Sequence, residues 1–269
     1  MDSLLTAGML GLVEGLTEFL PISSSGHLVI ASDLLGFSGS KASTFEVVIQ
    51  VGAILAVLVL YWKRFFGLLF PTERSGAFSG IRGIMLLVLT SLPASVLGLL
   101  LHGFIKSLFT PATVTAALVC GALLMLAVEH MVAHRQDRMP VQSLDQLSAA
   151  QAFGIGCFQC LALWPGFSRS ASTLMGGMIL GVRREVAAEY SFIAAVPIII
   201  GAAGYDLLKS LSLFSAADVP FFIVGSAVAF LSAIAAIRIF ISILGRNTLK
   251  PFAIYRLVLA VPVYFFMVR

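Results

Sequence analysis

Apolar residues run along this chain in stretches long enough to cross a lipid bilayer. A transmembrane helix needs about 20 consecutive apolar residues. Stretches of that length lie at 43–62, 83–102, 112–130, 188–206, 219–242 and 252–268. We therefore expect six transmembrane helices.

Two further apolar segments, at 4–35 and 150–182, are interrupted in the middle by polar sequence. Each is about 32 residues long, too short for two spans and too long for one. A re-entrant helix pair, which enters the membrane partway and returns to the side it came from, fits this length. Non-helical backbone at membrane depth must face protein or a wet cavity, so the two interruptions should border a cavity.

A broken segment followed by three spans occurs twice along the chain. Pro21 and Pro165, which begin the two interruptions, are 144 positions apart. Three spans per half make an odd number of crossings, so the second half should be inverted relative to the first. Inverted repeats whose broken helices meet near the midplane are a transporter architecture. We expect an all-α polytopic membrane protein with a single membrane domain, 1–269, made of a first repeat at 1–135 and an inverted second repeat at 145–269.

The composition agrees with a membrane protein. Hydrophobic residues make up 59% of the chain and charged residues 11%, whereas soluble domains carry about 25% charged residues. The 17 Lys and Arg and 13 Asp and Glu are scattered, which argues against a nucleic-acid-binding patch.

Basic residues are unevenly divided between the two sets of expected loops. Cytoplasmic loops are enriched in Lys and Arg, so the richer side should be cytoplasmic, with both termini and the mouth of the first broken segment outside. The richer side holds Lys63, Arg64, Arg74, Arg82, Arg135, Arg138, Arg183, Arg184, Arg246 and Lys250, and the poorer side holds Lys41, Lys106, Lys209 and Arg269.

Glu14 and Glu18 are four residues apart on an expected helix, so they share a face. Each ionisable group at mid-membrane costs about 2.5–3.5 kcal/mol on insertion scales. A divalent cation, a cationic side chain or a proton must neutralise the pair, and oxygen ligands favour Mg²⁺ or Ca²⁺. The alternative is a structural ion pair at a wet interface.

The first interruption reads PISSSGH, from Pro21 to His27. Pro21 ends a helix, and three serines and Gly26 lead into a second helix whose N-terminal N–H groups can bind an anion. We expect His27 to act as a general acid or base, although a lone histidine is more often a satisfied core residue.

The second interruption reads PGFSRSAST, from Pro165 to Thr173. Arg169 stands between hydroxyl residues in an otherwise apolar stretch, and its guanidinium can bind two phosphate or carboxylate oxygens at once. Alternatively, Arg169 only pairs with Glu14 or Glu18. Together the interruptions supply the groups needed for metal-assisted phosphoryl transfer, with a phosphorylated lipid as substrate.

Two long motifs carry a family resemblance. EGLTEFLPISSSGHL, from Glu14 to Leu28, and PGFSRSAST resemble the signature motifs of the undecaprenyl-pyrophosphate phosphatases, the bacitracin-resistance proteins. FEVVIQVGAILAV, from Phe45, and PFAIYR, from Pro251, are similar to the same family, so the likeness runs nearly end to end.

The resemblance implies hydrolysis of undecaprenyl diphosphate to undecaprenyl phosphate and inorganic phosphate. This reaction recycles the lipid carrier for peptidoglycan synthesis and confers bacitracin resistance. The resemblance also implies a divalent metal, Mg²⁺ or Ca²⁺, and a site in the bacterial inner membrane that faces the periplasm. Expected partners are the polyprenyl diphosphate substrate and membrane lipids, with a homodimer as an open alternative and no nucleic acid.

The resemblance and the motifs together assign the site. The nucleophile stays open between Ser24, His27 and water. The expected metal ligands are Glu14 and Glu18, the catalytic residues are Ser24, His27, Glu18 and Arg169, and the substrate-binding residues are Arg169, Ser23, Ser25, Gly26, Ser168, Ser170 and Thr173.

Two other functions compete with a phosphatase of this family. A transporter or lipid flippase would suit an inverted repeat, but moving a lipid headgroup needs no nucleophile. Type-2 phosphatidic-acid phosphatases share the fragments SSGH and SR, but Met175 stands where that family has its nucleophilic histidine.

Overall fold

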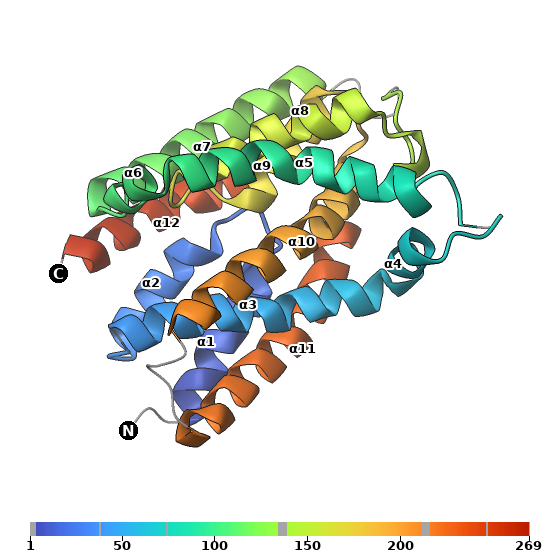
Figure 1. Cartoon of the computed structure of the whole chain (residues 1–269). Helices are drawn as coiled ribbons and strands as arrows, with labels where there is room; N and C mark the ends of the chain where they lie inside the picture. Colours follow the sequence, from blue (N-terminus) through green and yellow to red (C-terminus); the bar gives the residue numbers. More distant parts are fainter. Residues whose placement is uncertain are drawn as a thin grey trace.

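The computed structural model describes residues 4–37, 39–73, 75–133, 139–210, 216–245 and 247–268, and helices dominate it (Figure 1). Six of its helices are long and apolar enough to cross a membrane. They confirm the prediction of an all-α multi-pass membrane protein. These helices are α3 (Ser40–Leu60), α5 (Gly80–Leu100), α7 (Pro111–Val132), α10 (Arg184–Ser210), α11 (Val219–Leu244) and α12 (Lys250–Val268).

Each broken segment forms two short helices joined by non-helical backbone. Phe37, just after the first pair, packs against Phe221 near the start of α11. Gln151, near the start of the second pair, donates a hydrogen bond to the carbonyl of Leu180, just after that pair, at 2.9 Å. The pairs are α1 (Leu4–Thr17) with α2 (Ser24–Leu34), and α8 (Ala149–Gln159), followed by a 3₁₀ turn (Cys160–Leu163), with α9 (Arg169–Ile179).

Two short helices, α4 (Trp62–Leu69) and α6 (His102–Ser107), were not predicted. They follow the ends of α3 and α5. In α4, Gly67 and Leu68 are buried while Trp62 and Phe66 are exposed. Lys63 and Arg64 follow the apolar run of α3, and their charges led to the prediction of a loop there rather than a short helix.

The first helix of each half packs on a helix of the other half. A Cβ atom built on Gly11 of α1 would lie 2.2 Å from the carbonyl oxygen of Gly225 in α11. One built on Gly156 of α8 would lie 2.6 Å from the carbonyl oxygen of Thr90 in α5. Small residues permit such close approach of helices in membranes. The helices α3 and α10 also pack together, as do α7 and α12, so the halves interlock.

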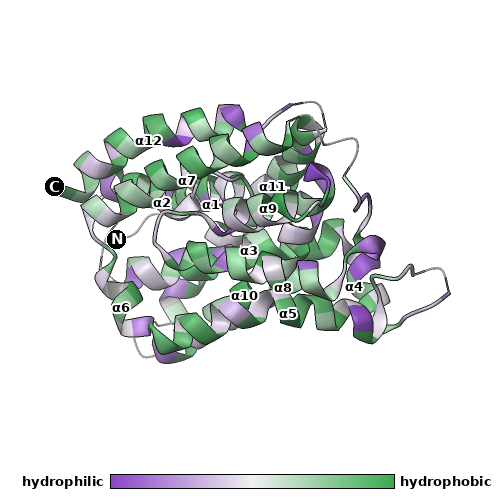
Figure 2. Cartoon of the chain, turned by 90° about the horizontal axis from the view of Figure 1, so that it is seen from above, coloured by the Kyte–Doolittle hydropathy of each residue, from purple (hydrophilic) through white to green (hydrophobic). Residues whose placement is uncertain are grey.

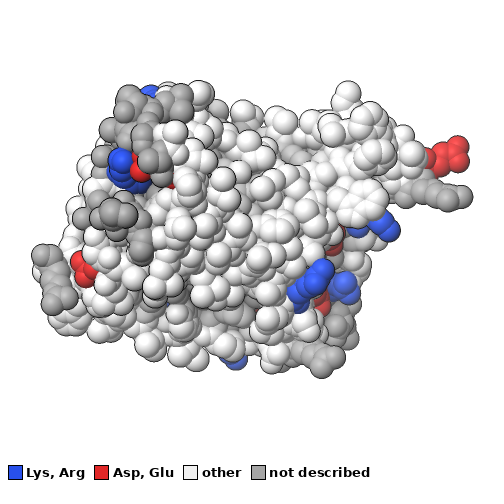
Figure 3. Space-filling view, turned by 90° about the horizontal axis from the view of Figure 1, so that it is seen from below, with Lys and Arg blue, Asp and Glu red and all other residues white. Residues whose placement is uncertain are grey.

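On the face shown in Figure 3, charged residues lie mainly toward the two ends, and the surface between them is almost uncharged. Seen from above, hydrophobic positions cover most of the helices (Figure 2). Lys41 pairs with Asp218 at one end (3.2 Å), and Arg64 lies 3.5 Å from Glu189 at the other. Of the basic residues used to predict the orientation, five lie outside the described residues: Arg74, Arg135, Arg138, Arg246 and Arg269.

The contact of α1 with α11 leads to a stability prediction. A Cβ on Gly15 would lie 2.1 Å from Ser232 Oγ and 2.2 Å from the Ala229 carbonyl oxygen, so Gly15→Ala forces the helices apart. We expect Gly15→Ala to lower the free energy of unfolding by about 1–3 kcal/mol, as overpacking does. Thermal melting of the purified protein in detergent measures this.

Gly8→Ala on the same helix is the matched control. The nearest atoms to its added Cβ are side-chain carbons at 3.9 and 4.0 Å, which is ordinary contact. Alanine is also the better helix former, so melting should be unchanged or slightly higher. Equal melting of the two variants would contradict the tight α1–α11 contact.

Candidate active site

The two interruptions share an unusual backbone conformation. Ser23 has φ 70° and Ser168 has φ 79°, and among the residues that the structure describes no other non-glycine residue has a positive φ. Such a conformation costs about 1–3 kcal/mol and persists only where the surroundings impose it. Each serine directly precedes a helix, so Ser24 and Arg169 are the first residues of α2 and α9. The two candidate groups therefore occupy equivalent positions, 145 residues apart.

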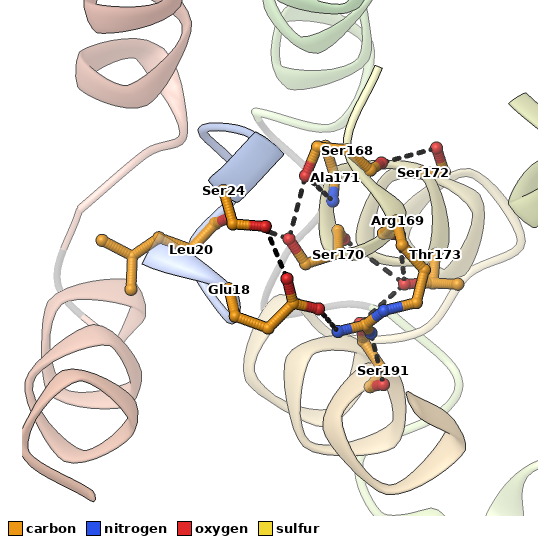
Figure 4. A network of polar contacts seen from close by, with 10 residues as sticks. All are labelled: Glu18, Leu20, Ser24, Ser168, Arg169, Ser170, Ala171, Ser172, Thr173 and Ser191. Atoms are coloured by element: carbon orange, nitrogen blue, oxygen red, sulfur yellow. Dashed lines mark hydrogen bonds and ion pairs between the residues drawn. The ribbon is translucent and has the colours of Figure 1, made fainter. Parts of the chain in front are cut away.

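Glu18 joins these two residues (Figure 4). The Ser24 hydroxyl donates to Glu18 Oε2 at 2.6 Å, and Arg169 Nη2 donates to Glu18 Oε1 at 3.0 Å. The side chains of Glu18 and Arg169 are only 10% and 13% exposed, so water screens this ion pair little. The structure thus brings three of the four predicted catalytic residues together.

A second set of contacts orients Arg169. Its Nη1 donates to the Ser191 carbonyl oxygen at 3.0 Å, and the hydroxyls of Thr173 and Ser191 lie 2.6 Å apart. Thr173 also donates to the carbonyl of Arg169 at 2.9 Å. Thr173 therefore contacts both the backbone of Arg169 and the hydroxyl of Ser191, the residue whose carbonyl accepts from the guanidinium. Ser191, on α10, was not predicted, because a serine inside an apolar span gives no signal of its own.

Hydroxyl contacts also tie the interruptions to each other. Ser170 donates to the carbonyl of Leu20 at 2.8 Å, and its hydroxyl lies 3.0 Å from that of Ser168. The Ser168 hydroxyl accepts from the Ala171 N–H at 3.3 Å and so caps α9. This network connects the two halves of the chain at the point where Ser24, Glu18 and Arg169 meet.

The interruptions border a cavity of about 330 Å³, as expected from their polar sequence. Its polar wall includes the Ser24, Glu18 and Arg169 side chains, and Gln50 and Gln159 complete that wall. The other predicted residues that line it are Ser23, Ser25 and Ser168. The remaining wall is apolar and comes mainly from α5, α6 and α10: Ala94, Ile105, Phe109, Leu163, Ile198, Ile199 and Ala202.

Five predicted residues do not line this cavity: Glu14, Gly26, His27, Ser170 and Thr173. A Cβ on Gly26 would meet only apolar side chains, the nearest at 3.6 Å, so this position faces α7 and α12. Ser170 and Thr173 are buried in the contacts described above.

His27 lies in a different pocket, which is otherwise mostly apolar. Its Nδ1 is 2.8 Å from the Ser23 carbonyl oxygen, and its Nε2 is 2.7 Å from the Tyr255 hydroxyl. The two rings also stack, with centroids 5.5 Å apart. Both ring nitrogens are therefore engaged away from Ser24 and Glu18.

Glu14 is fully buried, and neither carboxylate oxygen has a hydrogen-bond partner among the described residues. An isolated buried carboxylate is costly, so a cation or a proton must compensate it. No cluster of three or more His, Cys, Asp or Glu side chains that could hold a metal occurs within the described residues. Mg²⁺ is commonly held by one or two carboxylates together with substrate phosphates. Glu18 on the cavity wall and Glu14, buried one helical turn before it, are the two carboxylates that would hold such an ion.

Arg256 of α12 is a functional candidate that was not among the predicted site residues. It is fully buried, and its Nη1 donates to the carbonyls of Phe167 (2.8 Å) and Pro21 (3.5 Å). Its Nη2 donates to Gly166 (3.2 Å). One side chain thus holds the backbone of both interruptions. The signals in the sequence are its position at the end of the PFAIYR motif and its place inside an apolar span, where charge is costly.

Comparison with known proteins identifies the family to which this chain is similar. Residues 7–262 match the model of the family described as bacitracin resistance protein BacA. A protein of Desulfovibrio desulfuricans named undecaprenyl-diphosphatase is 63% identical over the whole of both chains. Proteins of the same name from Nitratidesulfovibrio vulgaris and Lawsonia intracellularis are 64% and 54% identical over 99% and 98% of each chain. The chain therefore belongs to the bacitracin resistance protein BacA family.

Proposed function

We infer that this protein hydrolyses undecaprenyl diphosphate to undecaprenyl phosphate and inorganic phosphate. Relatives that share 53–64% of its residues over nearly their full length are named for this activity. The observation that carries the inference is the meeting of Ser24, Glu18 and Arg169 in one cavity within a membrane protein. The reaction recycles the lipid carrier for peptidoglycan synthesis, and the family description connects it with bacitracin resistance.

We propose that Ser24 is the nucleophile. Its hydroxyl already donates to Glu18, which takes the proton as Oγ attacks the terminal phosphorus. The bond to the bridging oxygen breaks, and undecaprenyl phosphate leaves. Water then hydrolyses the phosphoserine, which releases inorganic phosphate and restores the serine. His27 is an unsuitable nucleophile in this arrangement because it lines another pocket.

Arg169 and the helix N-termini stabilise the phosphate charge in this proposal. The Arg169 guanidinium exchanges its contact with Glu18 for phosphate oxygens when the substrate enters. The first N–H groups of α2 and α9 provide further donors, since helix N-termini favour anions. Glu14 and Glu18 would hold a divalent cation, Mg²⁺ or Ca²⁺, which neutralises diphosphate charge when bound.

The membrane arrangement is also a proposal. We propose that 1–135 and 145–269 are inverted repeats, and that α1–α2 and α8–α9 are re-entrant pairs in the bacterial inner membrane. The reciprocal packing of α1 on α11 and of α8 on α5 supports this arrangement. By the positive-inside rule, both termini are periplasmic and the cavity opens to the periplasm.

The first test is phosphate release from undecaprenyl diphosphate by the purified protein in detergent. We expect release that EDTA abolishes and Mg²⁺ or Ca²⁺ restores. Arg169→Lys should reduce release by about tenfold or more, because an ammonium cannot replace the two-pronged guanidinium contact. A folded protein that releases no phosphate with metal supplied would refute the enzyme and favour a transporter.

Ser24→Ala tests the nucleophile. We expect kcat to fall by about a thousandfold or more, as removal of a nucleophile does. Rapid quenching with substrate labelled in the terminal phosphate should trap labelled wild-type protein but unlabelled Ser24→Ala. Ser25→Ala, whose hydroxyl is not a recorded partner of Glu18, should lose much less activity. If quenched wild-type protein carries no label, direct attack by water replaces the covalent route.

Arg256→Lys tests the residue that holds both interruptions. Lysine has three donors where arginine has five, so some of the carbonyls that Arg256 binds lose their hydrogen bond. Each buried carbonyl left without a donor lowers the free energy of unfolding by about 1–3 kcal/mol. We expect a lower melting temperature and a lower kcat. Arg238→Lys on α11, an exposed arginine, is the control and should leave both unchanged. Wild-type kcat in Arg256→Lys would show that this residue does not position the site.

A further inference from the structure

His27 and Tyr255 contact each other outside the catalytic cavity, which neither residue lines. His27 Nε2 lies 2.7 Å from the Tyr255 hydroxyl, and the two rings stack with an angle of 7° between their planes. His27 Nδ1 lies 2.8 Å from the carbonyl oxygen of Ser23. A general acid or base must reach the proton that it transfers, so these contacts point to another task for His27.

The two hydrogen bonds indicate which imidazole nitrogen carries the proton. A carbonyl oxygen only accepts, so Nδ1 of His27 is the donor to Ser23. In a neutral imidazole the other nitrogen then accepts, and the Tyr255 hydroxyl donates to Nε2. The ring therefore links Tyr255 on α12 to the backbone of the first interruption.

The carbonyl that His27 holds belongs to a strained residue. Ser23 has φ 70°, and such a conformation persists only where the surroundings impose it. The next residue is Ser24, whose hydroxyl donates to Glu18 at 2.6 Å. Because the backbone of Ser23 sets the direction in which α2 begins, a contact that fixes this backbone also fixes the position of Ser24 Oγ.

The second half of the chain holds its equivalent serine in the same way. Ser168 also has a positive φ, and Ser172 follows it by four residues, as His27 follows Ser23. The Ser172 hydroxyl donates to the Ser168 carbonyl at 2.8 Å. Ser172 is fully buried and does not line the catalytic cavity, so its hydroxyl supports the backbone and does not meet the substrate. Both halves thus use the side chain four residues later to hold the carbonyl of the strained serine.

Two consecutive residues of α12 hold the first interruption. Tyr255 acts on Ser23 through His27, and Arg256 Nη1 donates to the Pro21 carbonyl at 3.5 Å. Arg256 is fully buried whereas Tyr255 is 44% exposed, so the two side chains leave α12 on different sides. The carbonyls of Pro21 and Ser23 are therefore both connected to α12.

We propose that His27, oriented by Tyr255, is a positioning residue that holds the Ser23 carbonyl and thereby keeps Ser24 in place to attack. The inference rests on the proposed function, in which Ser24 is the nucleophile. In this role the imidazole transfers no proton to or from the substrate. Another donor at position 27 can then replace it, and the hydroxyl of Ser172 shows which donor suits this backbone.

His27→Ser and His27→Ala distinguish positioning from acid–base chemistry. Neither side chain replaces imidazole in proton transfer, but a serine hydroxyl can donate to the carbonyl four residues back, as that of Ser172 does. We expect His27→Ala to lower kcat for undecaprenyl diphosphate by about tenfold to a hundredfold, since a misplacement of about 1 Å has an effect of that size. His27→Ser should stay within about fivefold of wild type. KM should change little in either variant, because Arg169 is untouched.

Tyr255→Phe removes the hydroxyl that orients the imidazole and keeps the stacked ring. We expect kcat to fall by about threefold to tenfold in the wild-type background. In the His27→Ser background the same substitution should have no effect, since the imidazole that it orients is gone. Tyr264 lies on the same helix and is also 44% exposed, so Tyr264→Phe is the matched control and should leave kcat unchanged in both backgrounds.

The outcomes separate the inference from the proposed function. Equal losses of kcat in His27→Ser and His27→Ala, at wild-type melting temperatures, would overturn the inference and return proton transfer to His27. Wild-type kcat in His27→Ala would also overturn it. If His27→Ala melts well below wild type, Tyr255→Phe decides, and an equal effect in both backgrounds overturns the inference. If wild-type protein releases no phosphate, the proposed function fails instead.

Discussion

Satisfying backbone hydrogen bonds inside an apolar bundle is the constraint on which this structure depends. An interruption in a membrane helix exposes carbonyl and N–H groups that lipid cannot bind. Here the Arg256 guanidinium donates hydrogen bonds to the carbonyls of Pro21, Gly166 and Phe167. The Ser170 hydroxyl donates to the carbonyl of Leu20. Polar groups from within the bundle thus replace water. Without them the two interruptions could not lie side by side inside the bundle.

The same solution sets the electrostatics of the cavity. Every recorded hydrogen-bond acceptor of Arg256 is a carbonyl, so its charge is not cancelled by a neighbouring carboxylate in the described contacts. Arg169 adds a second positive charge, and Glu18 offsets one. The helices α2 and α9, which follow the interruptions, also present their N-termini there, and helix N-termini favour anions. Glu14, buried one helical turn before Glu18, adds a second carboxylate, so the two arginines and the two glutamates balance and the helix N-termini add the attraction for a diphosphate.

The sequence predicted what depends on length and local pattern, and missed what depends on packing. Six spans followed from apolar runs, and the motifs located Glu18, Ser24 and Arg169. The pocket that the His27 side chain enters was not predictable, because residues close together on one interruption line different pockets. Ser191 and Arg256 were missed for a similar reason. Their partners are distant in sequence, and only the packing of α10 and α12 against the interruptions brings them together.

The equivalence of Ser24 and Arg169 explains why the site needs both halves of the chain. Each follows a serine held at positive φ and begins a short helix, so the same backbone design presents a different side chain from each half. One side chain supplies a hydroxyl and the other a guanidinium, and Glu18 contacts both. In phosphoryl transfer the attacking and leaving oxygens lie roughly in line, and donors stabilise the charge on the remaining phosphate oxygens. The two helix N-termini, one from each half, bring the hydroxyl and the guanidinium needed for these two tasks to one cavity.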